Sequence, residues 1–417
     1  MILAGMDKIP VTTVSLIILG SMALLIRIGV ALHSCGLSRS KNAASSAIRS
    51  VVEMAVAILA FWALGGAIMS STGGAAFGFS RRLLFFLYGD DGGFLHIELF
   101  FNIVLVLIAV GPLAAAMGER SRMLPIVAGT MLLAAIVVPI CGYWTWINTG
   151  WLNRLGFIDA GGASVLHLTG GLVALIAAIA VGPRLGKYNT DGSSNLIPGH
   201  SVPQAASGIL LMAAGWIPYI VGASLLHLSN GIHAATSVLL AGAAATVVSY
   251  GLSRSRYGKP DILLTLGGFL GGLVAISAGA PVVSPIGAVA IGAVAGLLVN
   301  WATVYVDLAL KIDDPSGTLV AHILGGAWGT IAAGIFMPLN SWHARLAAVG
   351  IQGIGLAAMA VLALVLGGAL YAILKSTTQL RVSEADEFDG LDLAEHDLNG
   401  YPDFQQTMIK SYHLREA

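Results

Sequence analysis

The chain has 417 residues, of which 57% are hydrophobic and 10% are charged. Soluble proteins carry about 25% charged residues, so a water-soluble domain of this length is excluded. The composition predicts an all-α polytopic membrane protein. The 21 basic and 21 acidic residues cancel, which leaves no net charge that would favour nucleic acid as a partner.

Eleven apolar segments are long enough to cross a lipid bilayer as transmembrane helices. Basic residues are concentrated in the connections after the first, third, fifth, seventh and ninth segments and after the last. Because cytoplasmic loops carry the excess of Lys and Arg, we expect the N-terminus outside and the C-terminus inside, in a plasma or inner membrane. The segments fall near residues 11–34, 51–71, 98–117, 123–143, 162–182, 203–223, 231–252, 262–281, 286–308, 318–337 and 347–374.

One motif, Asp-x2-Gly-x4-His-x2-Gly-Gly, occurs twice. The first copy contains Asp159 and His167 and precedes the fifth span, and the second contains Asp314 and His322 and precedes the tenth. Because the two copies enter from opposite sides, they predict an inverted 5+5 repeat with a final helix left over. At about 1.5 Å per residue, each histidine is expected about 12 Å inside its helix, near the bilayer midplane. Paired titratable groups at that depth indicate a functional site.

The residue types around the two histidines limit their chemistry. Neither has a carboxylate or thiolate within helical reach, so we expect no metal site and no cofactor. Two neutral imidazoles can share one N–H···N bond and still offer one donor and one acceptor, which suits a small hydrogen-bonding molecule. Asp159 and Asp314 suit helix N-caps. The sequence has no Walker loop or nucleophile motif, and we expect no enzyme activity.

Several other polar residues are interpreted as structural. Arg27 lies in the middle of the first span, where a charge is costly in lipid, and we expect it to pack against Glu53. Four residues near predicted membrane boundaries are interpreted as interfacial or capping groups rather than substrate contacts: His96, Glu98, His227 and His233.

Five segments together resemble the ammonium transporter family (Amt/Mep/Rh) over nearly the whole chain. They are Gly36-Leu37-Ser38-Arg39-Ser40-Lys41-Asn42, Gly118-Glu119-Arg120, Asp159-Ala160-Gly161-Gly162 with His167, Asp313-Asp314-Pro315 with His322, and Gly390-Leu391-Asp392 with His396. The resemblance implies a homotrimer in which each subunit has a hydrophobic pore lined by His167 and His322. It also implies an ammonium transporter-type membrane domain over 1–375 and a cytoplasmic tail over 376–417.

The resemblance further implies a site that recruits ammonium and a gate, both altered in this sequence. The family's vestibule tryptophan corresponds to Trp146, and one of its two gate phenylalanines falls on Leu105, with Phe101 one turn away. The position of the second gate phenylalanine is occupied by Tyr219. The position of the recruiting serine is occupied by Ala223, with Ser224 beside it. The predicted recruitment vestibule therefore comprises Trp146, Asp159, Tyr219, Ala223 and Ser224, and the gate comprises Phe101 and Leu105.

Three functional hypotheses follow. In the first, ammonium is recruited outside and deprotonated, and ammonia is conducted past the twin histidines, because ammonia avoids most of the cost of moving an ion through a dry channel. In the second, a non-conducting ammonium sensor signals through its tail, because the gate is altered and residues 401–417 read as the start of a further helix. A fused signalling domain outside this sequence or a PII-type regulator would then be the partner. The third is a neutral-gas channel.

Overall fold

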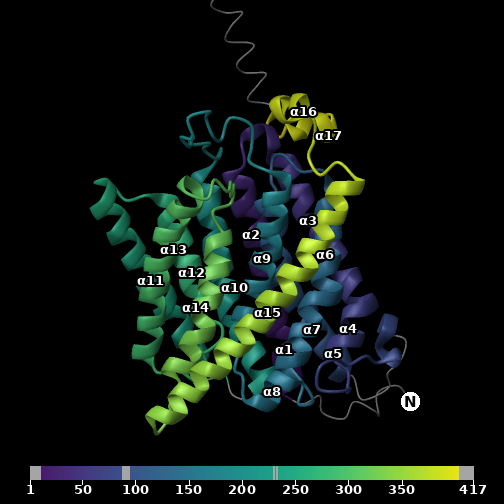
Figure 1. Cartoon of the computed structure of the whole chain (residues 1–417), viewed down its shortest axis with the longest axis vertical. Helices are drawn as coiled ribbons and strands as arrows, with labels where there is room; N and C mark the ends of the chain where they lie inside the picture. The colour runs from purple at the N-terminus through teal and green to yellow at the C-terminus, as the bar shows by residue number, and fades with distance from the viewer. Residues whose placement is uncertain (1–10, 87–93, 229–230, 232, 403–417) are drawn as a thin grey trace, which may run out of the picture.

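The chain folds into a bundle of long helices capped at one end by two short ones (Figure 1). The structure is a computed structural model that describes residues 11–86, 94–228, 231 and 233–402. Regular structure within these ranges is helical apart from two isolated β-bridges. The all-α class predicted from composition is therefore confirmed for the described residues. The segment expected to start a helix after Tyr401 lies, from Asp403 onward, outside the described residues.

Ten helical segments of the described chain are long and apolar enough to cross a membrane. They are Thr13–Leu37, Ser40–Met69, Leu95–Ala116, Met123–Leu155, Ala163–Val181, Val202–Leu228, Ala234–Tyr257, Pro285–Leu308, Leu319–Phe336 and Trp342–Thr377. The remaining predicted span, 262–281, corresponds to the shorter apolar helix Ile262–Ile276. Its 15 residues extend only about 22 Å, less than a hydrocarbon core of about 30 Å. A count of eleven complete spans stays a prediction.

Several spans consist of more than one helical element. The first span consists of α1 (Val11–Ala23) and α2 (Leu25–Leu37), and the second of η1 (Ser40–Asn42), α3 (Ala43–Ala60), η2 (Phe61–Gly65) and α4 (Gly66–Met69). The third is α5 (Phe94–Ala116). The fourth consists of α6 (Met123–Leu132), η4 (Leu133–Val137), α7 (Val138–Trp146) and α8 (Trp151–Leu155). The fifth and sixth are η5 (Ala163–Leu168) with α9 (Thr169–Val181), and α10 (Val202–Leu228). The rest are α11 (Ala234–Tyr257), α12 (Ile262–Ile276), α13 (Pro285–Leu308), α14 (Leu319–Phe336) and α15 (Trp342–Thr377). Three elements outside the spans are η3 (Arg81–Phe86), α16 (Glu384–Asp389) and α17 (Leu391–His396).

The helices that the predicted repeat would make equivalent pack against each other in antiparallel pairs. On α2 and α10, a Cβ at Gly29 would lie 2.5 Å from the Gly208 carbonyl oxygen, and one at Gly36 would lie 2.6 Å from the Ala205 nitrogen. Residue numbers therefore rise on one helix as they fall on the other. The η5–α9 segment meets α14 in the same sense, because Gly171 contacts His322 while Gly326 contacts Ala163. This is the arrangement that an inverted repeat requires.

The buried charge in the first span is neutralised within the protein. Arg27 Nη2 donates to Glu53 at 2.8 Å, and the two side chains are 4% and 1% exposed. Glu53 also accepts from the Ala114 amide at 3.0 Å, so the ion pair ties α2, α3 and α5 together. The expected packing of Arg27 against Glu53 is confirmed.

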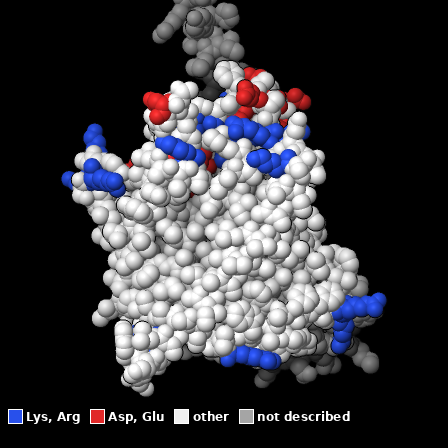
Figure 2. Space-filling model, in the orientation of Figure 1, with Lys and Arg blue, Asp and Glu red and all other residues white. Residues whose placement is uncertain are grey.

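Charged side chains gather at the two ends of the bundle, with a broad uncharged zone between them (Figure 2). The end that carries α16 and α17 has both acidic and basic groups, whereas the visible part of the opposite end has basic groups only. The uncharged zone is the part of the surface that suits the hydrocarbon core of a bilayer. Which end faces the cytoplasm stays a prediction from the distribution of basic residues.

Candidate functional site

Each motif copy forms a loop that its aspartate braces, followed by a helix. Asp159 accepts from the backbone amides of Ala163, Ser164 and Val165 at 2.6–3.0 Å and from the Ser164 hydroxyl at 2.7 Å. Asp314 likewise accepts from the amides of Ser316 and Leu319, at 3.1 and 2.8 Å. The N-cap residues are Gly162 and Thr318, so neither aspartate is itself the N-cap, but each carboxylate accepts amides of the first helical turn as predicted.

The glycine three residues after each aspartate explains why the helix begins late. Gly162 has φ +84° and Gly317 has φ +65°, a left-handed conformation that glycine adopts at little cost. The helical elements therefore begin at Ala163 and Leu319, and each histidine lies in the first turn or two. The expectation of about 12 Å of helix before each histidine was wrong, because the Asp-to-Gly segment is a loop.

We expect replacement of Gly317 by alanine to destabilise the protein by about 1–2 kcal/mol, the cost of a left-handed residue with a Cβ. A Cβ at Gly317 would meet nothing within 4 Å, so the loss would come from backbone strain alone. Gly350, in α15, is the matched control, because its Cβ also has open space but its backbone is helical. Thermal unfolding in detergent would compare the two variants. Equal stability of both would contradict this explanation of the motif glycine.

The two motif histidines meet inside the bundle. His167 Nδ1 and His322 Nδ1 lie 3.1 Å apart, their ring centroids lie 5.1 Å apart, and the side chains are 0% and 6% exposed. A Cβ at Gly171 would lie 3.1 Å from the His322 Cβ, so the motif glycines permit this approach. We call His167 and His322 the histidine pair. One nitrogen of the pair donates and the other accepts when both rings are neutral.

Two aromatic side chains cover the His167 side of the histidine pair. The Trp216 ring stacks on the His167 ring with centroids 5.1 Å apart and planes inclined by 10°. The Tyr219 hydroxyl donates to the Gly161 carbonyl and lies 3.4 Å from His167 Nε2. Trp216, which no motif singled out, is thus a direct neighbour of His167. Its position in the apolar sixth span gave no signal of that contact.

The predicted gate residues are both buried in α5. Phe101 and Leu105 are each 0% exposed. The Phe101 ring lies against Gly222 of α10, where a Cβ would approach its Cε2 atom to 2.5 Å. The gating role of either residue stays a prediction.

A cavity of about 140 Å³ lies between the start of α5 and the ends of α4, α7 and α10. We call it the vestibule cavity. It is lined by Met69, Glu98, Asn102, Trp146, Ile147, Leu226 and His227. Of the predicted recruitment residues, Trp146 lines it. The Asp159 carboxylate is engaged by η5 amides, and the Ser224 hydroxyl donates to the Ile220 carbonyl at 2.6 Å. The fully buried Ala223 and Tyr219 are not among its lining residues, and their recruitment role stays a prediction.

The vestibule cavity is lined by Glu98 and His227, which were interpreted as interfacial, and by Asn102, which was not singled out. The Asn102 side-chain oxygen is buried and has no hydrogen-bond partner, whereas Glu98 accepts from the Ser70 hydroxyl at 2.8 Å. His227 stacks on Trp146 with centroids 4.1 Å apart and planes 8° apart. The spacing of Glu98 and Asn102, one helical turn apart at the start of the third span, was the signal that could have identified them.

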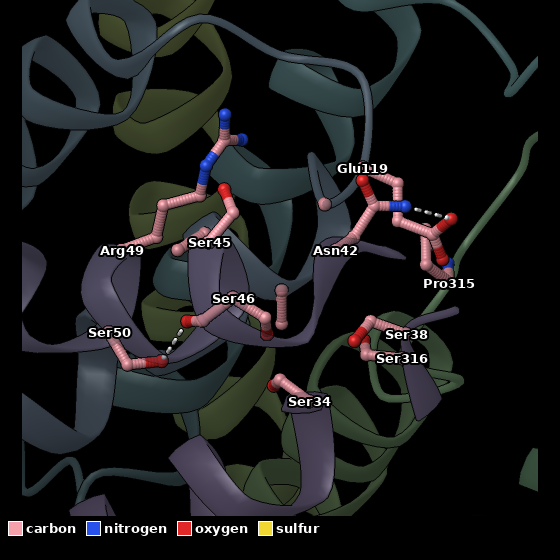
Figure 3. A pocket seen from close by; sticks show the side chains of 13 residues that line it. Ser34, Ser38, Asn42, Ser45, Ser46, Arg49, Ser50, Glu119, Pro315 and Ser316 are labelled. Atoms are coloured by element: carbon pink, nitrogen blue, oxygen red, sulfur yellow. Dashed lines mark hydrogen bonds between the residues drawn. The ribbon is translucent and has the colours of Figure 1, made fainter. Parts of the chain in front are cut away.

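Two smaller cavities lie beyond His322, toward the tail helices. A cavity of about 10 Å³ is bordered by His33, Ser34, Thr318 and His322, together with apolar side chains. Ser34 and Ala115 also border a second cavity, of about 20 Å³ (Figure 3). We call the first the histidine cavity and the second the serine cavity. The serine cavity is lined by Ser34, Ser38, Asn42, Ser45, Ser46, Arg49, Ser50, Ala114, Ala115, Gly118, Glu119, Pro315 and Ser316.

A buried ion network holds the loops next to the serine cavity. Arg184 donates to both oxygens of Asp313, at 2.8 and 2.9 Å, and to Glu119 at 2.9 Å. Burial raises the pKa of Asp313, but the hydrogen bonds and positive charge of Arg184 lower it by more, so that the pKa is about 2. In the described part of the chain no cluster of three or more His, Cys, Asp or Glu side chains could hold a metal ion.

The segment after α15 is docked onto the rim of the serine cavity. The Asp392 carboxylate accepts from the backbone amides of Ala44 and Ser45 at 3.0 and 2.7 Å, so it caps α3. Arg49, which lines the serine cavity, pairs with Glu395 at 3.0 Å. α15 ends at Thr377, two residues beyond the predicted domain boundary. Arg49 therefore belongs both to the lining of the serine cavity and to the contact with α17.

Comparison with known proteins identifies relatives over nearly the full length. The model of the Ammonium Transporter Family matches residues 14–401. The chain is similar to ammonium transporter Amt2 of Archaeoglobus fulgidus, with 32% identity over 96% of this chain and 90% of the relative. It is also similar to ammonium transporter Amt2 of Haloferax mediterranei, with 30% identity over 97% of this chain and 91% of the relative.

Solved structures resemble the whole helical bundle. A protein described as a sensor Amt protein superposes with a TM-score of 0.87 at 34% identity, over 92% of this chain and 98% of that one. Mep2 of Candida albicans superposes with a TM-score of 0.77 at 21% identity, over 90% and 87% of the two chains. The second comparison supports the fold alone.

Proposed function

Because the chain belongs to the ammonium transporter family, we propose that this multi-pass membrane protein moves ammonium across the cell membrane, with ammonia passing the histidine pair. The observation that carries the proposal is the 3.1 Å contact between His167 Nδ1 and His322 Nδ1. Two neutral imidazoles offer a donor and an acceptor to ammonia, which can make both kinds of hydrogen bond. Hydrogen bonds at the histidine pair would replace part of those that ammonia makes with water before it enters.

The vestibule cavity is the proposed entry site for ammonium. Its Glu98 carboxylate and the unpartnered Asn102 oxygen are acceptors for N–H groups, and the Trp146 ring adds a negative face. His227 occupies one face of Trp146, so the indole can offer at most its other face. Tyr219, Phe101 and Leu105 would then separate this cavity from the histidine pair. Ammonium gives its proton to water in the vestibule cavity before ammonia reaches the buried pair, because a bare cation is costly there.

The larger organisation follows the family resemblance. We propose a homotrimer with a membrane domain over 1–375 and a cytoplasmic tail over 376–417, of which residues 403–417 lie outside the described part. Lipid surrounds the uncharged zone of the surface. A PII-type regulator stays a predicted partner of the tail, and we propose no enzyme activity.

A second candidate function is ammonium sensing without conduction. It is favoured by the tail contacts with Arg49 and with the start of α3 at the serine cavity, and by the likeness to a solved sensor protein. In this hypothesis ammonium binding at the vestibule cavity changes how α17 docks. The altered gate at Leu105 and Tyr219 would then prevent passage.

One experiment separates the two functions. The purified chain is reconstituted into liposomes, and an ammonium gradient is applied while internal pH and current on a supported membrane are recorded. Transport predicts a rise in internal pH, a current, or both, above protein-free liposomes. Ammonium binding measured by calorimetry with neither signal would reject transport and favour the sensor. A spin label at Glu384, in exposed α16, would then report whether ammonium moves the tail.

A further inference from the structure

His227 is a histidine of the vestibule cavity that belongs to neither motif copy. It is the second-last residue of α10, and its ring stacks on Trp146 with centroids 4.1 Å apart. Its Nδ1 lies 3.2 Å from the carbonyl oxygen of Ala160, in the first motif loop. A carbonyl oxygen can only accept, so this contact is a hydrogen bond when Nδ1 carries the proton.

That hydrogen bond decides which nitrogen of the ring is left as an acceptor. A neutral imidazole has one N–H, so a proton on Nδ1 of His227 leaves the lone pair on Nε2. An ordinary histidine is already mostly neutral at about pH 7.5, and partial burial favours the neutral form. Nε2 has no hydrogen-bond partner among the described residues, and it is not enclosed by protein. His227 therefore presents a nitrogen acceptor to the cavity that it lines.

The vestibule cavity has two further acceptors, both near the start of α5. The Asn102 side-chain oxygen has no partner in the described part of the chain, although the residue is only 2% exposed. The Glu98 carboxylate lies one helical turn earlier and lines the same cavity. Its charge attracts any small cation, and oxygen ligands suit potassium as well as ammonium. These two side chains therefore explain why a cation enters, but not which cation is preferred.

The nitrogen acceptor distinguishes between cations of the same charge. Ammonium has N–H groups and can donate one of them to the Nε2 lone pair of His227. Potassium and sodium have no hydrogen to donate, and they take oxygen ligands in proteins. A hydrogen bond from a charged donor is also stronger than one between neutral groups. The contact with Nε2 would thus be gained by ammonium alone.

We propose that His227 Nε2 makes the vestibule cavity selective for cations that carry N–H groups, ammonium above all, over potassium and sodium. Glu98 supplies the negative charge, and Asn102 supplies an oxygen acceptor. The stack on Trp146 and the bond to Ala160 hold the ring so that Nε2 stays available. The inference rests on the proposed entry site for ammonium and deepens it. It concerns binding, so it applies to a conducting and to a non-conducting protein alike.

Solid-state NMR tests the state of the ring in the full chain. The protein is labelled with ¹⁵N-histidine and ¹³C-alanine in lipid bilayers at about pH 7.5. We expect a protonated Nδ1 that correlates with the Ala160 carbonyl carbon, and an unprotonated Nε2 in the same ring. Ammonium chloride should shift the Nε2 signal, whereas the same concentration of potassium chloride should not. A protonated Nε2, or equal shifts with both salts, would overturn the proposal. The wild-type spectra decide this even if no variant folds.

Calorimetry in detergent tests the selectivity by comparing ammonium chloride with potassium chloride. His227→Phe keeps an aromatic ring but removes the acceptor, so the dissociation constant of ammonium should rise about tenfold or more while that of potassium stays unchanged. His227→Gln provides an acceptor oxygen, which should recover ammonium binding and also tighten potassium binding, so that selectivity stays low. His343→Phe, at an exposed position on α15, is the control and should match the wild type.

The ratio of the two dissociation constants decides the outcome. An unchanged ratio in folded His227→Phe overturns the selectivity role, as does a wild-type protein that binds potassium as tightly as ammonium. Failure of transport is a separate result. A chain that moves no ammonium in liposomes but binds it with a preference that depends on His227 rejects transport and keeps this inference.

Discussion

Replacement of His322 by phenylalanine is expected to lower ammonium flux by about 10- to 100-fold, because it leaves His167 Nδ1 without its partner in a fully buried site. An unsatisfied buried polar group costs about 1–3 kcal/mol, and each 1.36 kcal/mol changes a rate about tenfold. The ring contact with His167 at 3.1 Å is lost, while a similar apolar volume is kept. Flux is measured from the internal pH of proteoliposomes after an ammonium jump.

The control for this variant is His343→Phe, which changes an exposed histidine on α15 and should leave the flux unchanged. Thermal unfolding of both variants establishes that each is folded. A folded His322→Phe protein with wild-type flux would show that ammonia does not depend on the histidine pair, and the proposed path would have to be abandoned.

Replacement of Arg184 by glutamine is expected to destabilise the protein by about 3–5 kcal/mol, because it leaves buried carboxylates without their main cation. Arg184 contacts Asp313 at 2.8 Å and Glu119 at 2.9 Å, and the two carboxylates are 1% exposed. The unfolding free energy in detergent measures the loss. Arg154→Gln, at an exposed arginine of α8, is the matched control and should change stability by less than about 0.5 kcal/mol.

The same network predicts how stability depends on pH. The pKa of Asp313 in the folded protein is about 2, below the value of about 3.9 in an unfolded chain. The stabilisation from its charge is therefore complete above about pH 4 and is lost as the pH falls through about 2. In Arg184→Gln the folded-state pKa of Asp313 moves up toward the unfolded value, so the loss of stability between about pH 4 and pH 2 should be smaller than in the wild type. Identical acid profiles of the two proteins would contradict the pairing.

Much of the candidate site could be predicted because two short motifs repeat with identical spacing. The equal distance from Asp159 to His167 and from Asp314 to His322 indicated that the two histidines converge, and they do. The start of each helix could not be predicted from the apolar pattern. The left-handed backbone at Gly162 and Gly317 places a loop where the pattern continues without interruption.

Other members of the site could not be found from the sequence because apolar spans have little amphipathic pattern. A helix that is hydrophobic all round is compatible with any rotation about its axis. The sequence of α5 therefore did not indicate that Asn102 faces a cavity. His227 was interpreted as an interfacial residue, and His33, within the first span, was not singled out. Their neighbours, the Ser316 carbonyl and the Trp146 ring, are far away along the chain.

The amino-acid sequence by itself determined the membrane class, the order of the spans, the duplicated aspartate–histidine motif and the family resemblance, because these depend on composition and spacing along one chain. Only the tertiary structure decided which side chains share a cavity, that both nitrogens of His33 face carbonyl oxygens, and that α17 caps α3 through Asp392. These contacts join residues up to 348 positions apart. They depend on how each helix is rotated and how closely glycines let it approach its neighbour, which an almost uniformly apolar sequence does not encode locally.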